Sequence, residues 1–216
     1  MLRKTSCAQN FIYSLSREVQ SYPAMKIKIC GLKNSVDVDY VNEAMPDYIG
    51  FVFAKSKRHI SPEIAAEFKN RLNPKITAVG VFVNAEISSI SQLYDAGVIN
   101  IAQLHGSETE TYINELKKIC DIPVIKAINA EVTPPTNADY LLFDNGKGGS
   151  GESFDWNLIP KCGKDYFLAG GINLNNIEKA MKLKPYGIDL SSGTETNGEK
   201  DREKIIRLVQ IAREEK

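Results

Sequence analysis

The chain has 216 residues, of which 43% are hydrophobic and 25% are charged, a composition typical of a globular protein with one sizeable core. Its 27 basic residues are balanced by 27 acidic ones, so it lacks the basic excess of a general nucleic-acid-binding protein. No apolar run approaches the roughly 18 residues of a membrane-spanning helix. We therefore expect neither a nucleic-acid partner nor a membrane segment.

Residues 1–24 differ from the rest of the chain. They show no regular hydrophobic period, and Met25 follows them just before the first predicted strand. Three basic residues, several serines and a single acid give a weak likeness to a transit peptide, without the apolar core of a secretory signal. We interpret residues 1–24 as a dispensable extension and residues 25–216 as the folded domain.

The cysteines and histidines argue against disulfides and metal sites. The four cysteines are far apart and form no Cys-x-x-Cys pair, which is typical of a reducing compartment such as the cytoplasm. Two separated histidines, His59 and His105, are too few for an obvious metal cluster. We expect a cytoplasmic protein with no bound metal.

Beyond Met25, strand-like and helix-like segments alternate. Eight segments predict strands, at residues 26–30, 48–53, 76–83, 100–104, 123–128, 139–143, 165–169 and 186–190. Five segments predict helices, at residues 61–72, 86–97, 107–120, 173–183 and 201–215. The first of these helices has Ser61 as its N-cap and Pro62 at its first position. Between the fifth and sixth strands, Pro134 and Pro135 exclude a helix, so we expect an irregular loop there.

Eight strands alternating with helices indicate a parallel sheet. Without residues 1–24 the chain has about 190 residues, at the small end of the range for a closed (β/α)8 barrel. The competing fold is an open, doubly wound sheet, which usually carries Gly-x-Gly-x-x-Gly after its first strand. This chain has Cys-Gly-Leu-Lys-Asn-Ser at that position. We therefore predict the closed barrel.

Polar residues and glycines gather where the predicted strands end. In a barrel of this kind the chemistry is found at the carboxyl ends of the strands. Any one of these residues is also explained as a turn former or a packed cysteine. Taken together they favour a functional site. They are Cys30-Gly31, Gln103 to Gly106, Asp144-Asn145, Gly170-Gly171 and Asp189 to Gly193.

Two of these segments predict a phosphate site. Gly170 and Gly171 follow the seventh strand, ahead of a helix that we expect Asn173 to cap. Ser192 and Gly193 follow the eighth strand. Glycine lets backbone N–H groups approach an anion closely, and the loops after strands seven and eight are the usual phosphate site of such barrels. A third glycine stretch, residues 148–151, fits either a loop that closes over a ligand or a linker.

Successive blocks of the chain read KICGLKN, GFVFAKSKRHISPE, VGVFVN, QLHGSE, VIKAI, LLFDN, GGSGESFDW, LAGGINLNNI and GIDLSSGTE. In this order they resemble the signature blocks of the phosphoribosylanthranilate isomerase family of tryptophan biosynthesis. The resemblance runs from about residue 26 to the C-terminus and leaves out residues 1–24. The segment with the two prolines, where the sequence predicts no helix, is the main departure from the family pattern.

The resemblance implies an Amadori rearrangement of N-(5-phosphoribosyl)anthranilate. Opening of the sugar ring requires an acid at the ring oxygen, and loss of the C2′ proton requires a base. The protonated imine acts as the electron sink, so the family needs no cofactor and no metal. The implied ligand is a small phosphosugar, bound by a monomer or a homodimer.

By resemblance, Cys30 is the general base and Asp144 the general acid. A thiol is a weak base unless it is ionised, so its surroundings must help. Side chains alternate along a strand, which predicts that Lys28 points inward beneath Cys30 while Ile27 and Ile29 face the helices. The Lys28 charge then either favours the thiolate or is taken up by an interior carboxylate.

Four further residues match substrate-binding positions of the family. Arg58 matches the partner of the anthranilate carboxylate, which suits a planar guanidinium. Asp189 matches an acceptor for the anthranilate N–H. Gln103 and His105 lie at the mouth of the barrel, where we expect His105 to line the site rather than to catalyse.

Three other readings compete with this one. A ribulose-phosphate epimerase would use paired acids and metal-binding histidines. An isomerase that also serves histidine biosynthesis would have carboxylates at the ends of strands one and six, whereas strand one ends in Cys30. A barrel that only binds its ligand would have lost Cys30 or Asp144.

Overall fold

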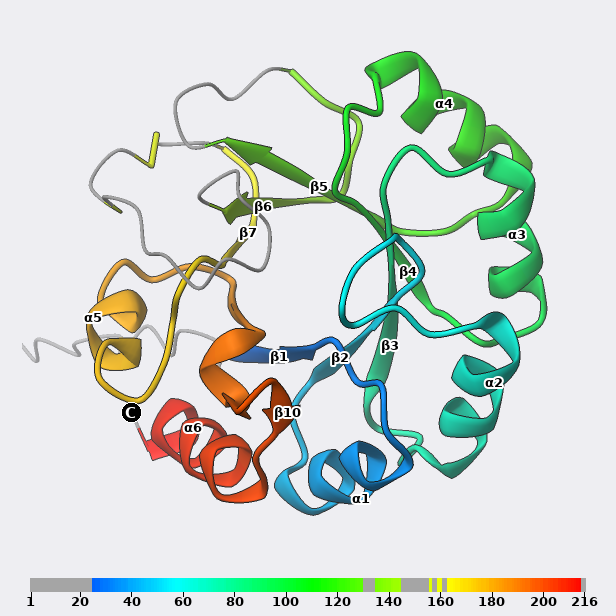
Figure 1. Ribbon diagram of the computed structural model, residues 1–216. Coiled ribbons are helices and arrows are strands. Elements are labelled where there is room, and N and C mark those ends of the chain that lie inside the picture. Colours follow the sequence, from blue (N-terminus) through cyan, green and yellow to red (C-terminus); the bar gives the residue numbers. More distant parts are fainter. Residues whose placement is uncertain (1–24, 130–134, 145–155, 157–158, 161–162, 215–216) are drawn as a thin grey trace, which may run out of the picture.

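The computed structural model describes residues 25–129, 135–144, 156, 159–160 and 163–214. Eight parallel strands form a closed barrel in which each strand pairs with the next along the chain and β8 pairs with β1 (Figure 1). The closed barrel is confirmed, and the open sheet is excluded. The strands are β1 (Lys26–Cys30), β2 (Tyr48–Val52), β3 (Thr77–Phe82), β4 (Ile101–Leu104), β5 (Val124–Asn129), β6 (Tyr140–Asp144), β7 (Tyr166–Leu168) and β8 (Gly187–Leu190).

Helices surround the strands on the outside of the barrel (Figure 1). All five predicted helices are present. The structure adds a helix between β1 and β2, and a short hairpin, β9 (Glu195–Thr196) with β10 (Glu199–Lys200), after β8. The α-helices are α1 (Ser35–Ala44), α2 (Pro62–Arg71), α3 (Ile87–Asp95), α4 (Glu110–Ile119), α5 (Ile177–Met181) and α6 (Arg202–Glu214), and a 3-10 helix (Ser192–Thr194) follows β8.

The sequence analysis did not predict helix α1, because the first residues of this helix have the pattern of a strand. It begins Ser-Val-Asp-Val-Asp, in which polar and apolar residues alternate with the period of a strand. The usable signal was a capping pattern, Asn34 followed three residues later by Asp37. The Asp37 carboxylate accepts hydrogen bonds from the backbone N–H groups of Lys33 and Asn34, at 2.9 and 3.0 Å.

Two local predictions concern the later half of the barrel. Helix α5 begins at Ile177 after Asn176, so the expectation that Asn173 caps it is wrong. Asn173 instead turns the chain ahead of the helix, because its carbonyl oxygen accepts from the N–H groups of Asn176 and Ile177.

Between β5 and β6, residues 135–139 form no helix, and residues 130–134 lie outside the described residues. The extension 1–24 and the glycine stretch 148–151 also lie outside them.

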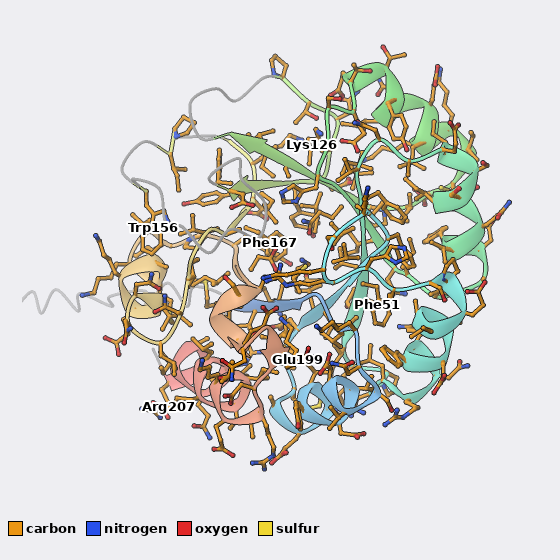
Figure 2. All side chains as sticks on the ribbon, viewed as in Figure 1. Phe51, Lys126, Trp156, Phe167, Glu199 and Arg207 are labelled. Atoms are coloured by element: carbon orange, nitrogen blue, oxygen red, sulfur yellow. The ribbon has the colours of Figure 1, made fainter. Side chains whose placement is uncertain are left out.

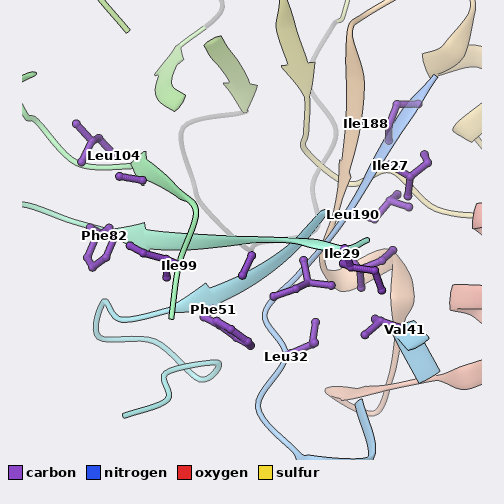
Figure 3. Packing of buried hydrophobic residues seen from close by; sticks show 14 of the residues in the cluster. Ile27, Ile29, Leu32, Val41, Phe51, Phe82, Ile99, Leu104, Ile188 and Leu190 are labelled. Atoms are coloured by element: carbon purple, nitrogen blue, oxygen red, sulfur yellow. The ribbon is translucent and has the colours of Figure 1, made fainter. Parts of the chain in front are cut away.

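Side chains of successive residues enter two different parts of the core. Within the barrel, Phe167 of β7, labelled in Figure 2, belongs to a cluster with Val79, Ile125 and Leu142 from three other strands. Ile27 and Ile29 of β1 belong to the larger cluster between strands and helices (Figure 3). Lys28 and Cys30 therefore face the barrel interior, as the alternation predicts. This arrangement places the Cys30 thiol in the part of the interior that lies at the carboxyl ends of the strands, where β1 ends.

Candidate active site

A cavity of about 220 Å³ lies at the carboxyl ends of the strands. Residues at or just after the ends of seven strands meet there, although they are far apart in the chain. The cavity receives nine of the ten residues that the sequence singled out. They are Cys30, Arg58, Gln103, His105, Asp144, Gly170, Gly171, Asp189 and Ser192.

Cys30 is the last residue of β1 and is held between a charged pair and a glycine. Its Cα is paired in register with Gly50 of β2, and a Cβ on Gly50 would lie 2.7 Å from the Cys30 sulfur. Glycine is therefore required at position 50 to leave room for the thiol, a requirement that sequence reading missed. Burial raises the pKa of the Cys30 thiol, and the nearby charge of Lys28 opposes this rise only in part.

Lys28 lies directly beneath the thiol and is fully buried. Its Nζ donates to Oδ1 of Asp189 at 2.9 Å, because β1 and β8 pair Lys28 with Asp189 in register. Lys28 also interacts with Cys30. The two sequence interpretations of Lys28 are thus both partly right, since the lysine pairs with an interior carboxylate and still affects the thiol.

Asp144 ends β6 and faces the cavity beside His105. Nε2 of His105 lies 3.3 Å from Oδ2 of Asp144, and Nδ1 of the same ring lies 3.0 Å from Nε2 of Gln103. Gln103 is almost fully buried, so it fixes the orientation of the imidazole ring. His105 is therefore in direct contact with Asp144, the residue predicted from the sequence to be the acid. From the sequence we expected His105 only to line the mouth of the barrel.

Arg58 follows β2 and contributes to the cavity with a guanidinium that is already paired. Its Nε and Nη2 donate to the two carboxylate oxygens of Glu195, at 2.6 and 2.9 Å. Lys200 donates to the same carboxylate at 3.1 Å. Sequence reading missed Glu195 and Lys200, because charged residues in a short loop sequence are normally solvated and only the fold brings these two inward.

The loops after β7 and β8 form one wall of the cavity. Gly170 and Gly171 have φ angles of 87° and 64°, in the left-handed region that favours glycine. Among the described residues, none accepts a hydrogen bond from the backbone N–H of Gly171 or Ser192. Gly193 does not line this cavity. A Cβ there would lie 1.9 Å from the carbonyl oxygen of Ile172, so Gly193 lets the two loops pack backbone to backbone.

The described residues offer neither a metal site nor a membrane-spanning helix. No three or more histidine, cysteine, aspartate or glutamate residues within that part of the chain are grouped so that they could hold a metal ion. No helix there is long and apolar enough to cross a membrane.

Comparisons with known proteins agree with one another. A family model described as N-(5'phosphoribosyl)anthranilate (PRA) isomerase matches residues 27–211. A relative from Endomicrobium trichonymphae, named N-(5'-phosphoribosyl)anthranilate isomerase, is 49% identical over 196 residues, which cover 87% of this chain and 98% of the relative.

Solved structures similar to this chain carry the same family name. Phosphoribosyl anthranilate isomerase from Thermus thermophilus matches with a TM-score of 0.79 and 32% identity, over 86% of this chain and 97% of that one. A second phosphoribosyl anthranilate isomerase, in complex with reduced 1-(o-carboxyphenylamino)-1-deoxyribulose 5-phosphate, matches with a TM-score of 0.71 and 31% identity, over 87% and 98% of the two chains.

Proposed function

The chain belongs to the N-(5'-phosphoribosyl)anthranilate isomerase family, and we propose that Cys30 and Asp144 perform the proton transfers of its reaction. The chain catalyses the Amadori rearrangement of N-(5-phosphoribosyl)anthranilate to 1-(2-carboxyphenylamino)-1-deoxyribulose 5-phosphate in tryptophan biosynthesis. The observation that carries the proposal is that the thiol and the carboxylate end two different strands and line the same cavity.

In the proposed mechanism Asp144 acts first. It gives a proton to the ring oxygen of the sugar, the bond from C1′ to that oxygen breaks, and a protonated imine forms between C1′ and the anthranilate nitrogen. His105, in contact with Asp144, orients the carboxyl group for this transfer. The Cys30 thiolate then removes the C2′ proton, and the electrons of that bond move toward the protonated imine. The resulting enolamine becomes the ketose product by tautomerisation.

The substrate is held at its two ends. Arg58 binds the anthranilate carboxylate, beside an apolar wall of Val52, Ala54 and Val81 that suits the aromatic ring. One oxygen of Asp189 accepts from Lys28, which leaves the other to accept the anthranilate N–H. At the other end, the N–H groups of the loops that contain Gly170, Gly171, Ser192 and Gly193 bind the phosphate. Gln103 and His105 line the space between.

The proposal is tested by following the loss of the substrate's anthranilate fluorescence with wild-type protein and with single variants of Cys30 and Asp144. Wild-type protein should consume the substrate, and the two variants should do so far more slowly. Variants that consume it at the wild-type rate would show that other groups transfer the protons.

Substitution of Gly171 tests the phosphate site. Gly171→Val puts a side chain where the phosphate approaches the backbone, so we expect KM to rise at least about tenfold while kcat changes less. Inorganic phosphate should compete with the substrate in the wild-type protein. Gly97→Val is the matched control, because Gly97 also has a positive φ, of 69°, but faces open space at the end of α3. Equal KM values for both variants would place the phosphate elsewhere.

We also propose that residues 25–216 are sufficient for catalysis. All eight strands, and the cavity-lining residues within the described part of the chain, lie beyond residue 24. Deletion of residues 1–24 should therefore change kcat/KM by less than about twofold. A loss of more than about tenfold, or 1.4 kcal/mol, would show that the extension packs on the barrel.

We propose that the enzyme acts as a monomer or homodimer in the cytoplasm, on a small phosphosugar and without nucleic acid.

A further inference from the structure

Two buried charges beside the cavity have no part in the proposed mechanism. Glu195 and Lys200 belong to the β9–β10 hairpin, which lies between α1 and α6 next to the end of β1 (Figure 1). The Glu195 side chain is 6% exposed and that of Lys200 is 1% exposed. Burial of two charged side chains is costly unless they are paired and hydrogen-bonded, so their arrangement requires an explanation.

Glu195 occupies one edge of the Arg58 guanidinium. The carboxylate accepts from Nε and Nη2, so both of its oxygens lie along the side of the planar group. Nη1 has no hydrogen-bond partner among the described residues. The end of the guanidinium, formed by Nη1 and the second N–H of Nη2, can therefore take another carboxylate in the same two-point geometry.

The stem of Arg58 is held from below by the turn after Cys30. Gly31 has a φ angle of 85°, and a Cβ at this position would lie 2.4 Å from Cδ of Arg58. The arginine stem thus lies directly over the residue that follows the thiol. Glycine at position 31 leaves room for the stem, and the two hydrogen bonds to Glu195 fix the rotation of its planar end.

Lys200 anchors Glu195 in turn. Its Nζ donates to the carbonyl oxygen of Ser191 at 3.1 Å and to Oγ1 of Thr194 at 3.0 Å, as well as to Glu195. Burial alone would raise the pKa of Glu195, but the hydrogen bonds from Arg58 and the charge of Lys200 lower it, which keeps the carboxylate ionised. Because Ser191 also lines the cavity, the anchor ties Arg58 to the loop that follows β8.

We infer that Glu195, anchored by Lys200, is a positioning residue that presents the free end of the Arg58 guanidinium to the carboxylate of the substrate. The inference rests on the proposed role of Arg58. Its consequence is that Glu195 makes the enzyme selective for an aromatic amine with a carboxylate next to the nitrogen, although Glu195 itself does not touch the substrate.

The test uses two ligands that differ only in this carboxylate. One is reduced 1-(o-carboxyphenylamino)-1-deoxyribulose 5-phosphate, and the other is its counterpart made from aniline. In Glu195→Gln a neutral amide replaces the carboxylate, and its NH₂ group cannot accept from Arg58. We expect affinity for the carboxylate ligand to fall at least about tenfold, affinity for the aniline ligand to change less than about twofold, and KM to rise with kcat within about threefold of wild type.

Glu199→Gln is the matched control. Glu199 belongs to the same hairpin (Figure 2), but it is exposed and contacts Lys33 and Asn34 instead of Arg58. This variant should bind both ligands as wild type does. If Glu195→Gln does not fold, Glu195→Asp replaces it, because a shorter carboxylate keeps the charge but cannot reach both guanidinium nitrogens.

The outcomes separate the inference from the assignment on which it rests. Equal losses for the two ligands, or no loss for either, in the Glu195 variant would overturn the positioning role. Arg58→Ala should discriminate between the ligands even more strongly. If it weakens both ligands equally, Arg58 does not bind the carboxylate, and both the assignment and the inference fail.

Discussion

Replacing Cys30 with alanine, or Asp144 with asparagine, should lower kcat by at least the roughly hundredfold that general acid–base catalysis typically contributes. In the proposed mechanism both residues transfer protons during the reaction, and neither holds the substrate in the ground state. Their removal should therefore leave the affinity for the reduced product within about threefold of wild type. Arg58→Ala should show the opposite pattern, with a loss of binding, because the anthranilate carboxylate loses its proposed partner.

The measurement is single-variant kinetics by anthranilate fluorescence, together with the dissociation constant of the reduced product. Cys120→Ala is the matched control for Cys30→Ala, since Cys120 is also a buried thiol but ends α4 away from the cavity. It should retain wild-type kcat. Turnover near the wild-type value in Cys30→Ala would exclude the thiolate as the base.

The role of Cys30 as the base can also be tested by measuring kcat/KM at different pH values. Burial raises the pKa of the Cys30 thiol above its ordinary value, so the thiolate is a minor species at neutral pH and becomes more abundant as pH rises. In the wild-type enzyme kcat/KM should therefore still be increasing at about pH 8.5, the usual pKa of a free thiol. In Cys30→Asp the base is a stronger acid, and this rise should move to lower pH. A rise that stays in place would mean that another group controls it.

The positions of the strands were predictable because each strand has its own local sequence pattern. Buried parallel strands are short apolar runs, and all eight observed strands begin and end within one residue of the predicted bounds. Helix α1 was not predicted because Val36 and Val38 alternate with polar neighbours, and the packing of the helix against α6 and α2 outweighs this local pattern. Tertiary context decides such segments, so their sequence alone is ambiguous.

Residues of the candidate site were predictable where position along a strand fixes direction. Cys30, Asp144 and Asp189 each end or nearly end a strand, and the barrel brings strand ends together. Contacts between loops were not predictable in this way. The pairing of Arg58 with Glu195 joins residues 137 positions apart, and the close packing of Gly193 on Ile172 depends on the detailed path of two loops. Neither loop path follows from periodicity or turn chemistry.

Replacing Lys28 with methionine should destabilise the fold by about 3–5 kcal/mol, because it leaves the buried Asp189 carboxylate without its partner. Burial alone would lower the pKa of Lys28, but Asp189, together with Cys30, outweighs this and raises it. A lysine whose pKa rises on folding stabilises the native state fully below its unfolded pKa of about 10.4, and loses this contribution as pH rises through the higher folded-state value. Urea unfolding at pH 7 therefore reports the whole effect.

A double variant separates the buried charge from simple loss of packing. Lys28→Met combined with Asp189→Asn removes both charges and should recover at least about half of the lost stability, since a buried neutral amide costs much less than a buried lone carboxylate. Lys26→Met is the matched control on the same strand. Its partner Asp47 keeps the hydrogen bonds from Arg213 and from the backbone of Ile27, and the pair is partly exposed, so the cost should stay below about 1 kcal/mol. Equal losses in Lys26→Met and Lys28→Met, or a double variant no more stable than Lys28→Met, would show that the buried pair does not set the stability of the barrel interior beneath Cys30.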